Sequence, residues 1–294
     1  MIRKTPITGD PVILAPEREQ RPDAYDGASC PFCPGAESQT PPEIARDVGR
    51  ILQPARPDGL ENPSHVYPWR IRVFPNKYPA TEQHELIVES PLHGATFDQL
   101  APDHAARAVE MMFARYRALR DAAPYVCLFK NHGRAAGATI AHIHSQIVGT
   151  PFIPLRVARE GDAFAKRCRL CAMDTHPLIA ETHHYRWIAP LGATMAYQQW
   201  IVPNAHGNEM DEPRELATLL QDSARAMLTV NDSFNWAFIN FPHEERGHWY
   251  VELFPRAAVV AGFELGSGTF INTIDPVDTA TTLRAAAAAR PSAR

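Results

Sequence analysis

Hydrophobic residues recur along the chain with two different periods, and each period predicts one type of element. Residues 98–123 carry apolar side chains at three- and four-residue steps, which is the pattern of a helix with one buried face. Short apolar runs bounded by Pro, Gly and Asn predict strands. The strands predicted in the first half are 69–79, 84–91, 125–133 and 139–149. The order is therefore strands, helix, strands.

A similar order of elements returns after about residue 160. A helical pattern covers 212–232, and an Ala-rich segment over 282–294 predicts a last helix that frays into a disordered tail. The strands predicted in the second half are 185–192, 197–207, 235–242 and 247–256. Matching order with little identity indicates an internal duplication. We therefore expect an α+β fold of two tandem duplicated domains, 1–160 and 161–294, each an antiparallel sheet with packed helices.

Composition and charge exclude several classes of protein. The chain has 294 residues, is 45% hydrophobic, and has a formal net charge of −4 with 21% charged residues. These values allow a buried core. They do not show the excess of basic residues that is typical of proteins that bind nucleic acid or charged membrane surfaces. No apolar run approaches the roughly 18 residues that a membrane span needs, and no signal-type apolar block opens the chain. We expect a cytoplasmic protein that binds neither nucleic acid nor membranes.

Four of the five cysteines form two Cys-x-x-Cys pairs. In a cytosolic chain such pairs indicate metal or redox chemistry rather than disulfides. Each pair is followed by two histidines at matching places, and structural zinc takes four Cys and His ligands. The predicted zinc ligands are Cys30, Cys33, His93 and His142 in one set, and Cys168, Cys171, His206 and His248 in the other. The spacing leaves open that the cysteines are simply reduced thiols on the surface or in the core.

Six other histidines lack a repeated partner pattern and are expected to be surface or satisfied core residues: His65, His84, His104, His176, His183 and His243.

Polar side chains alternate with apolar ones at His142, His144 and Gln146. Alternate residues of a strand share one face, so these three are predicted to line up. The small residues of 131–139 just before them offer backbone amides that can hold a phosphate. A neutral imidazole, with an unperturbed pKa of ~6.5, is a competent nucleophile. The alternative is a half-buried strand whose polar face meets solvent.

These motifs resemble the galactose-1-phosphate uridylyltransferase family of the histidine-triad superfamily, and are most similar to the branch that includes ADP-glucose phosphorylase. The matching segments run nearly end to end: LAPEREQRP, CPFC, VFPNKYP, ESPLH, NHGRAAGATIAHIHSQ, CRLC, VPNAH, GHW and AGFELGSGTFIN. The resemblance implies histidine-triad-like domains. The catalytic strand and the first zinc site would lie in 1–160, and the second zinc site and a sugar-phosphate segment in 161–294.

The resemblance also implies a mechanism and a set of binding residues. His144 would attack the α-phosphorus of a nucleoside diphosphate sugar and hold the nucleotide until a second phosphate accepts it. His142 would bind zinc, and Gln146 would hydrogen-bond the phosphoryl oxygens. The implied nucleotide and phosphate contacts are Arg18, Arg21, Asn76, Asn131, Gly137, Thr139 and Gln146, and the implied sugar-phosphate contacts are Glu264 and Asn272. A homodimer with shared sites is implied as well.

Two departures from the family pattern affect the expected number of active sites and the expected reaction. Tyr250 replaces a possible second nucleophile, so we expect one active site per chain. Gln146 stands where histidine-triad hydrolases carry a third His, and an amide cannot shuttle a proton, which favours transfer between phosphates over hydrolysis. The alternatives are a phosphorylase that uses inorganic phosphate, a hydrolase of nucleotide conjugates, and a zinc-stabilised nucleotide-binding module without catalysis.

Overall fold

The protein is described by a computed structural model, which covers residues 1–21, 23, 25, 29–48, 67–172, 175–242 and 247–289. Its described strands are β1 (Ile2–Lys4), β2 (Pro11–Ile13), β3 (Ala45–Asp47), β4 (Ile71–Pro75), β5 (Gln83–Val88), β6 (Tyr125–His132), β7 (His144–Thr150), β8 (Leu178–Glu181), β9 (Tyr185–Ile188), β10 (Gln199–Pro203), β11 (Phe234–Ile239) and β12 (Tyr250–Pro255). Its described α-helices are α1 (Pro102–Arg120), α2 (Leu155–Lys166), α3 (Pro213–Leu228), α4 (Gly262–Ser267) and α5 (Pro276–Ala288).

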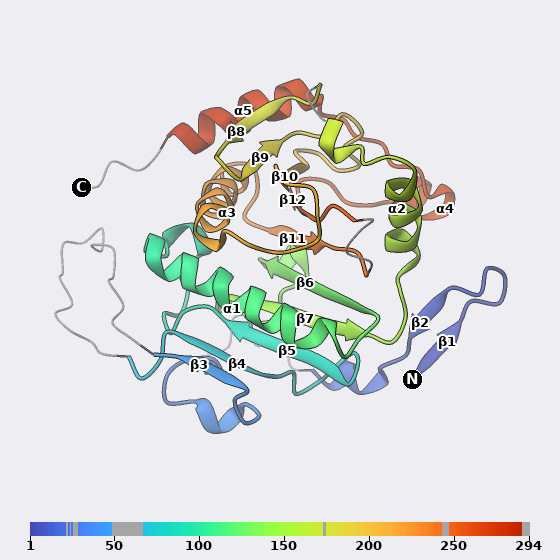
Figure 1. The fold of residues 1–294 in the computed structure, drawn as a ribbon. Helices are drawn as coiled ribbons and strands as arrows, with labels where there is room; N and C mark the ends of the chain where they lie inside the picture. The colour runs from blue at the N-terminus through green and yellow to red at the C-terminus, as the bar shows by residue number, and fades with distance from the viewer. Residues whose placement is uncertain are drawn as a thin grey trace.

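One ten-stranded antiparallel sheet runs through both halves of the chain (Figure 1). Its order is β3-β4-β5-β7-β6-β11-β12-β10-β9-β8, so the second half repeats the order of the first in reverse. The two halves meet where β6 pairs with β11, with Asn131 opposite Asn235. Strands β1 and β2 form a separate hairpin that projects from the body of the molecule. The division into domains at residue 160 stays a prediction.

Helices α1 and α3 lie beside each other on one face of the sheet, where they cover the main core (Figure 1). The apolar stripe of α1, which includes Val109, Met112 and Phe113, is fully buried in the core with Phe238 of β11 and with Trp249, which precedes β12. The periodicity therefore predicted the correct buried face. Burying side chains of this size stabilises each by about 1.5–3 kcal/mol relative to exposure.

The structure confirms the predicted order of strands and helices, with two informative differences at element boundaries. The first long helix begins at Pro102 rather than at residue 98, because proline is favoured at the first helical position and Phe97–Gln99 form a short 3-10 turn instead. The strand predicted over 139–149 was wrong at its start, since β7 begins at His144. His142 therefore precedes the strand, and both faces of β7 are buried.

The elements that the sequence pattern missed are short or irregular. Strands β1 and β3 have three residues each, which is too few to show an alternation. Helix α2 has only one buried residue, Val157, and its pattern was not singled out in the sequence. The last helix starts at Pro276, where Asp275 caps it, rather than at residue 282. Residues 290–294 of the predicted tail lie outside the described residues. His65 and His243 lie outside them as well. No helix in the described ranges is long and apolar enough to cross a lipid bilayer.

Candidate functional site

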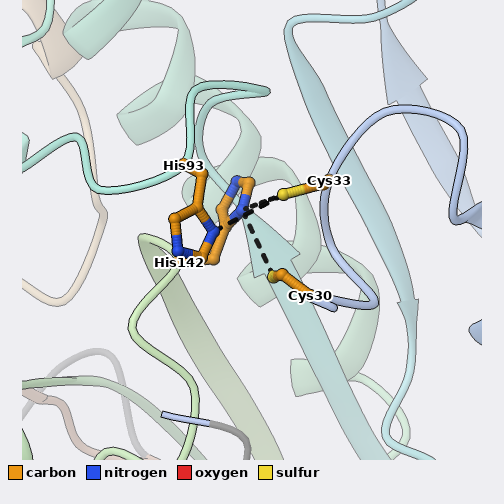
Figure 2. A group of neighbouring side chains, drawn as sticks. All are labelled: Cys30, Cys33, His93 and His142. Atoms are coloured by element: carbon orange, nitrogen blue, oxygen red, sulfur yellow. Dashed lines mark hydrogen bonds between the residues drawn. The ribbon is translucent and has the colours of Figure 1, made fainter. Parts of the chain in front are cut away.

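The first predicted ligand set forms a compact cluster of two thiols and two imidazoles (Figure 2). The Nδ1 atom of His142 lies 3.6 Å from Cys30 Sγ and 3.7 Å from Cys33 Sγ, and Cys33 Sγ lies 3.5 Å from Nδ1 of His93. The turn that carries both cysteines is closed by a hydrogen bond from the Cys33 amide to the Cys30 carbonyl. All four ligand atoms lie within 4.8 Å of one another.

These distances and donor states fit a tetrahedral metal ion. Ligands about 2.3 Å (S) and 2.0 Å (N) from one tetrahedral ion lie about 3.5 Å apart, as found here. His142 directs its other ring nitrogen to the carbonyl oxygen of Ser90 at 2.6 Å, which leaves Nδ1 as a lone-pair donor. Burial lowers the pKa of His142 to about 4, so the ring is neutral. Burial and the Cys30 thiol raise the pKa of Cys33 to about 11, and a bound cation would reverse that effect.

The second ligand set repeats this arrangement in the other half of the chain. The Nδ1 atom of His248 lies 3.3 Å from Cys168 Sγ and 3.5 Å from Cys171 Sγ, and Cys171 Sγ lies 3.3 Å from Nδ1 of His206. The other ring nitrogen of His248 donates to the carbonyl oxygen of Pro203 at 2.9 Å. The eight predicted ligands therefore come together in two groups of four, each with the donor set of a structural zinc site.

The ring of His144 is oriented by the residue that anchors the first cluster. Its Nδ1–H donates to the carbonyl oxygen of His142 at 2.8 Å, so the lone pair is on Nε2. Burial lowers the pKa of His144 to about 4, which keeps the ring neutral. The ring of Phe32, from the Cys30–Cys33 turn, packs edge-on against it with centroids 5.3 Å apart. His144 is thus a fixed, uncharged imidazole whose lone pair is on Nε2.

Gln146 is held by a histidine on the neighbouring strand. The amide N–H of Ala80 donates to Nδ1 of His84 at 3.0 Å, so the ring proton is on Nε2. That proton is donated to Oε1 of Gln146 at 3.0 Å. Burial lowers the pKa of His84 to about 4, so the ring cannot serve as a second cation. The carbonyl oxygen of Gln146 is therefore the acceptor for His84, and its NH2 group takes no part in that contact.

A buried ion pair lies beneath the start of β7. Lys130 and Glu89 are 1% and 0% exposed, with Nζ 2.6 Å from Oε2. Lys130 also donates to the carbonyl oxygen of His144 at 3.0 Å, and Ser145 donates to the other oxygen of Glu89. Burial lowers the pKa of Lys130, opposed by Glu89. Since both charges bond to β7, they fix the strand that carries His144.

His144 and Gln146 line a pocket of about 80 Å³, which we call the N-terminal pocket. Six residues of the predicted site line it: Arg21, Asn76, Gly137, Thr139, His144 and Gln146. Arg18 lies outside the lining and donates to the carbonyl oxygen of Tyr78, which does line it. The predicted site residues that line the pocket thus come from the ends of η1 (Pro16–Gln20) and β4, from β7 and from the turn before β7.

Asn131 acts on the turn before β7 rather than on the pocket. Its Oδ1 accepts a hydrogen bond from Nδ2 of Asn235 at 2.8 Å, and the same Asn235 amide reaches the carbonyl of Ala136 at 3.0 Å. The turn also needs Gly133, which has φ 83° and whose added Cβ would lie 2.2 Å from Ser233 Oγ. The β6–β11 contact therefore shapes the loop that borders the N-terminal pocket.

The two predicted sugar-phosphate residues do not line the N-terminal pocket. Glu264 lies on α4, where its carboxylate caps the helix by accepting from the Ala261 amide. Asn272 donates to the carbonyl oxygen of Ala193 at 3.2 Å. Val260 and Phe270, which flank α4, border a larger cavity in the second half of the chain. One chain therefore does not bring Glu264 and Asn272 to His144.

Sequence reasoning missed three residues that position His144 and Gln146. His84 was assigned to the surface or the satisfied core, and Phe32 and Lys130 were not singled out. The sequence does hold one signal, because His84 and Leu86 alternate on a predicted strand. In the structure β5 pairs with β7, which puts Leu86 opposite Gln146. Without that pairing, nothing links His84 to Gln146 across 62 residues.

Comparisons with known proteins find relatives over nearly the whole chain. A family profile described as "Domain of unknown function (DUF4921)" matches residues 101–290. ADP-glucose phosphorylase of Arabidopsis thaliana is 28% identical over 340 residues, covering 96% of this chain and 92% of that protein. Galactose-1-phosphate uridylyltransferase of Thermotoga maritima is 24% identical over 314 residues, covering 96% of this chain and 97% of that protein.

Solved structures give the same grouping. The crystal structure of the Arabidopsis thaliana ADP-glucose phosphorylase with bound ADP-glucose is 28% identical, has a TM-score of 0.76, and covers 97% of both chains. A uridylyltransferase structure with a TM-score of 0.78 and 23% identity, covering 98% of both chains, shows the shared fold. The chain belongs to the family described as DUF4921 and is a homologue of ADP-glucose phosphorylase and of the galactose-1-phosphate uridylyltransferases.

Proposed function

We propose that this protein is a nucleotidyltransferase that moves a nucleoside monophosphate between sugar 1-phosphates by way of a nucleotidyl-histidine at His144. The observation that carries the proposal is the state of the His144 ring. It is neutral, its Nδ1–H is committed to the His142 carbonyl, and it lines the N-terminal pocket beside Gln146. Relatives over nearly the whole chain carry the names of enzymes that act on nucleotide sugars.

In the first step, Nε2 of His144 attacks the α-phosphorus of a nucleoside diphosphate sugar. The new N–P bond forms as the bond from that phosphorus to the bridging oxygen breaks, and the sugar 1-phosphate leaves with the electron pair. Attack places a positive charge on the imidazole. The carbonyl oxygen of His142, which already accepts the Nδ1–H, stabilises that charge without any rearrangement.

In the second step, an oxygen of the acceptor phosphate attacks the same phosphorus, and the N–P bond breaks. Both transition states carry negative charge on the phosphoryl oxygens. The NH2 group of Gln146, turned toward the pocket by His84, and the guanidinium of Arg21 supply donors for those oxygens. Neither donor accepts a proton at neutral pH, so the site suits phosphate nucleophiles better than water.

We assign both Cys2His2 clusters to Zn²⁺, one held by Cys30, Cys33, His93 and His142, the other by Cys168, Cys171, His206 and His248. The mixed thiolate and imidazole donors and the closed four-ligand sets support zinc over harder cations. Zinc would supply structural crosslinks rather than an activated water, since four protein ligands complete its tetrahedral shell. In the first half it would fix His142, and through the His142 carbonyl the ring of His144.

A phosphorylase is the second candidate, in which inorganic phosphate takes the place of the sugar 1-phosphate acceptor. The 28% identity to ADP-glucose phosphorylase over nearly all of that protein favours it. The first step would be the same in both enzymes, so only the acceptor differs.

The test follows the two steps separately. The protein is incubated with UDP- and ADP-sugars, and intact mass is measured to find a covalent adduct of one nucleoside monophosphate. We expect the adduct with one base and none in His144→Ala. The adduct is then desalted and mixed with glucose 1-phosphate, galactose 1-phosphate or inorganic phosphate. Release by a sugar 1-phosphate supports the transferase, and release by phosphate alone supports the phosphorylase. If no donor labels the native protein, the proposed function is wrong.

We further propose that the active enzyme is a homodimer. Glu264 and Asn272 lie away from the N-terminal pocket of their own chain, so a sugar-phosphate role requires a second copy. The projecting β1–β2 hairpin carries exposed apolar side chains, including Ile2 on β1 at 42% and Ile7 in the turn at 95%. Apolar side chains on an extended hairpin favour burial against another chain.

A further inference from the structure

The second half of the chain contains a cavity of about 1250 Å³, which we call the C-terminal pocket. It lies among α2, β10, β12 and the residues that flank α4, and Figure 1 shows α2 and α4 at the same end of these strands. A cavity of this size exceeds the 300–1,000 Å³ typical of small-molecule sites. None of the predicted catalytic or nucleotide contacts lines it.

The C-terminal pocket occupies the place that mirrors the N-terminal pocket in the palindromic sheet. Pro31 and Phe32, between the first pair of cysteines, line the N-terminal pocket, and Arg169 and Leu170, between the second pair, line the C-terminal pocket. On the two equivalent strands, His144 and Gln146 follow His142 at steps of two and four. Tyr250 and Glu252 follow His248 in the same way and line the C-terminal pocket. The two cavities are thus built from equivalent positions.

The positions of His144 and Gln146 are occupied in the C-terminal pocket by Tyr250 and Glu252, and both of these side chains already have hydrogen-bond partners in the protein. Arg156 makes a two-pronged contact with Glu252, with Nη1 to Oε2 at 2.7 Å and Nη2 to Oε1 at 2.9 Å. Gln198, at the position equivalent to His84, donates to the same Oε1 at 2.6 Å. Tyr250 donates its hydroxyl proton to Glu160 at 2.9 Å. A phenol held in this way is not a nucleophile, so the C-terminal pocket lacks the reactive group of the N-terminal pocket.

The lining of the C-terminal pocket combines cations with aromatic faces. Beyond the neutralised Arg156–Glu252 pair, four further cationic side chains line it: Lys166, Arg167, Arg169 and Arg256. Glu160 is the other carboxylate of the lining. Trp200 and Tyr250 present rings with centroids 4.7 Å apart. Aromatic faces bind planar bases and guanidinium groups bind phosphates, which is the pairing that a nucleotide requires.

We propose that the C-terminal pocket is a second, non-catalytic binding site for a nucleoside diphosphate or its sugar conjugate. The inference rests in part on the proposed function, because the mirrored N-terminal pocket is assigned to a nucleotide there. The positive excess of the lining selects a phosphate-bearing ligand over a neutral sugar. Each chain would then hold two nucleotides, one that reacts at His144 and one that does not react.

Trp200 makes a specific reporter for this site. Of the five tryptophans, Trp69, Trp187, Trp236 and Trp249 are at most 1% exposed, whereas Trp200 is half-buried and lines the C-terminal pocket. ADP and UDP are titrated into the His144→Ala chain, which cannot form the adduct. We expect quenching of tryptophan fluorescence that is lost in His144→Ala/Trp200→Phe. Equilibrium dialysis of the same sample is expected to give two nucleotides per chain.

Charge reversal in the pocket assigns the second nucleotide. In the His144→Ala background, Arg167→Glu/Arg256→Glu is expected to reduce the count to one per chain and to weaken quenching at least tenfold. Arg159→Glu, on α2 and outside the lining, is the control and is expected to keep both nucleotides. Ala163→Trp, at an exposed position of the lining, blocks the cavity sterically and should repeat the loss if the charge variant fails to fold.

The outcomes separate this inference from the proposed function. A His144 adduct in the native protein, together with a single nucleotide per chain that survives Arg167→Glu/Arg256→Glu, overturns the second site alone. Two nucleotides per chain without any adduct overturns the catalytic proposal alone. Absence of nucleotide binding of any kind overturns both.

Discussion

The imidazole of His84 and the amide of Gln146 are joined by a hydrogen bond of 3.0 Å between Nε2 and Oε1. The Ala80 amide N–H occupies Nδ1 of His84, so Nε2 is the donor and the Gln146 carbonyl is the acceptor. His84 thereby decides which end of the Gln146 amide faces the N-terminal pocket. Because an amide turned the wrong way would present an acceptor to a phosphate, this orientation matters for binding of an anion.

Removing His84 is expected to slow adduct formation at His144. Gln146→Ala should reduce the rate about 10²–10³-fold, as for loss of one preorganised donor. His84→Ala should reduce it about 10–100-fold, the range for loss of a supporting contact. The double variant should be no slower than Gln146→Ala, because His84 acts through Gln146. Rapid-quench mass measurement gives the rates. His84→Gln, which restores a donor near Nε2, is expected to recover most of the rate, and multiplicative losses would contradict this coupling.

Metal analysis of the purified protein is expected to find two zinc ions per chain, one for each Cys2His2 cluster. Cys30→Ser/Cys33→Ser should lower the content to one ion and slow adduct formation, because His142 then no longer fixes the ring of His144. Cys168→Ser/Cys171→Ser should also lower the content to one ion but leave the adduct rate unchanged. A chelator should lower the melting temperature of the native protein. Finding no metal at all would refute both assignments.

The Lys130–Glu89 pair gives a prediction about stability. Lys130→Met leaves the Glu89 carboxylate buried without its cation, which is expected to lower the free energy of unfolding by about 3–5 kcal/mol. Lys130→Met/Glu89→Gln removes both charges and keeps an acceptor for Ser145, so its loss should be smaller than that of the single variant. Urea unfolding measures both values. Equal losses would mean that the unpaired charge is not the cause.

Two glycines test the strain in the turn before β7. Gly133 has φ 83° and ψ 159°, and an added Cβ would collide with Ser233. Gly133→Ala is therefore expected to lower the free energy of unfolding by about 1–3 kcal/mol or more. Gly192→Ala meets nothing within 4 Å and serves as the control, with a change within about 0.5 kcal/mol. Thermal unfolding compares the two. The Gly133 variant should also slow labelling of His144, since the turn borders the pocket.

A mixing experiment tests the shared active site. His144→Ala and Glu264→Ala/Asn272→Ala chains are each expected to lack sugar-phosphate exchange. In a mixed dimer, an intact His144 from one chain meets intact Glu264 and Asn272 from the other. Refolding an equal mixture together should therefore restore about a quarter of the wild-type sites. Sedimentation gives the oligomeric state in parallel. A monomer, or a mixture that stays inactive, would refute the homodimer proposal.

Much of the fold was visible in the sequence because its signals are local. The period of α1, the turn residues around β5 and β6, and the duplicated order of elements all depend on neighbours along the chain. The two Cys2His2 groups were predictable for a different reason, since each half repeats the same residue types in the same order. Repetition supplied the long-range information that a single segment lacks.

What the sequence could not predict depends on strand pairing and on where an element starts. The partnership of His84 with Gln146 requires β5 to lie beside β7 in one register. The strand prediction over 139–149 failed at His142 because the backbone there must bend to present a ring to Cys30 and Cys33, which alternation cannot reveal. The C-terminal pocket was also missed, since its cations and aromatic rings come from segments between 156 and 270 with no common motif.

The pairing of β6 with β11 has a consequence for how this chain can be divided. Each strand closes the open edge of the other half, so a fragment ending near residue 160 would expose the backbone of the eight-residue β6. Exposed edges recruit strands from other molecules and lead to aggregation. Two such fragments would satisfy each other through the same antiparallel contact. In the intact chain the contact between β6 and β11 therefore lies within one molecule, and truncation would turn it into an interface between two molecules.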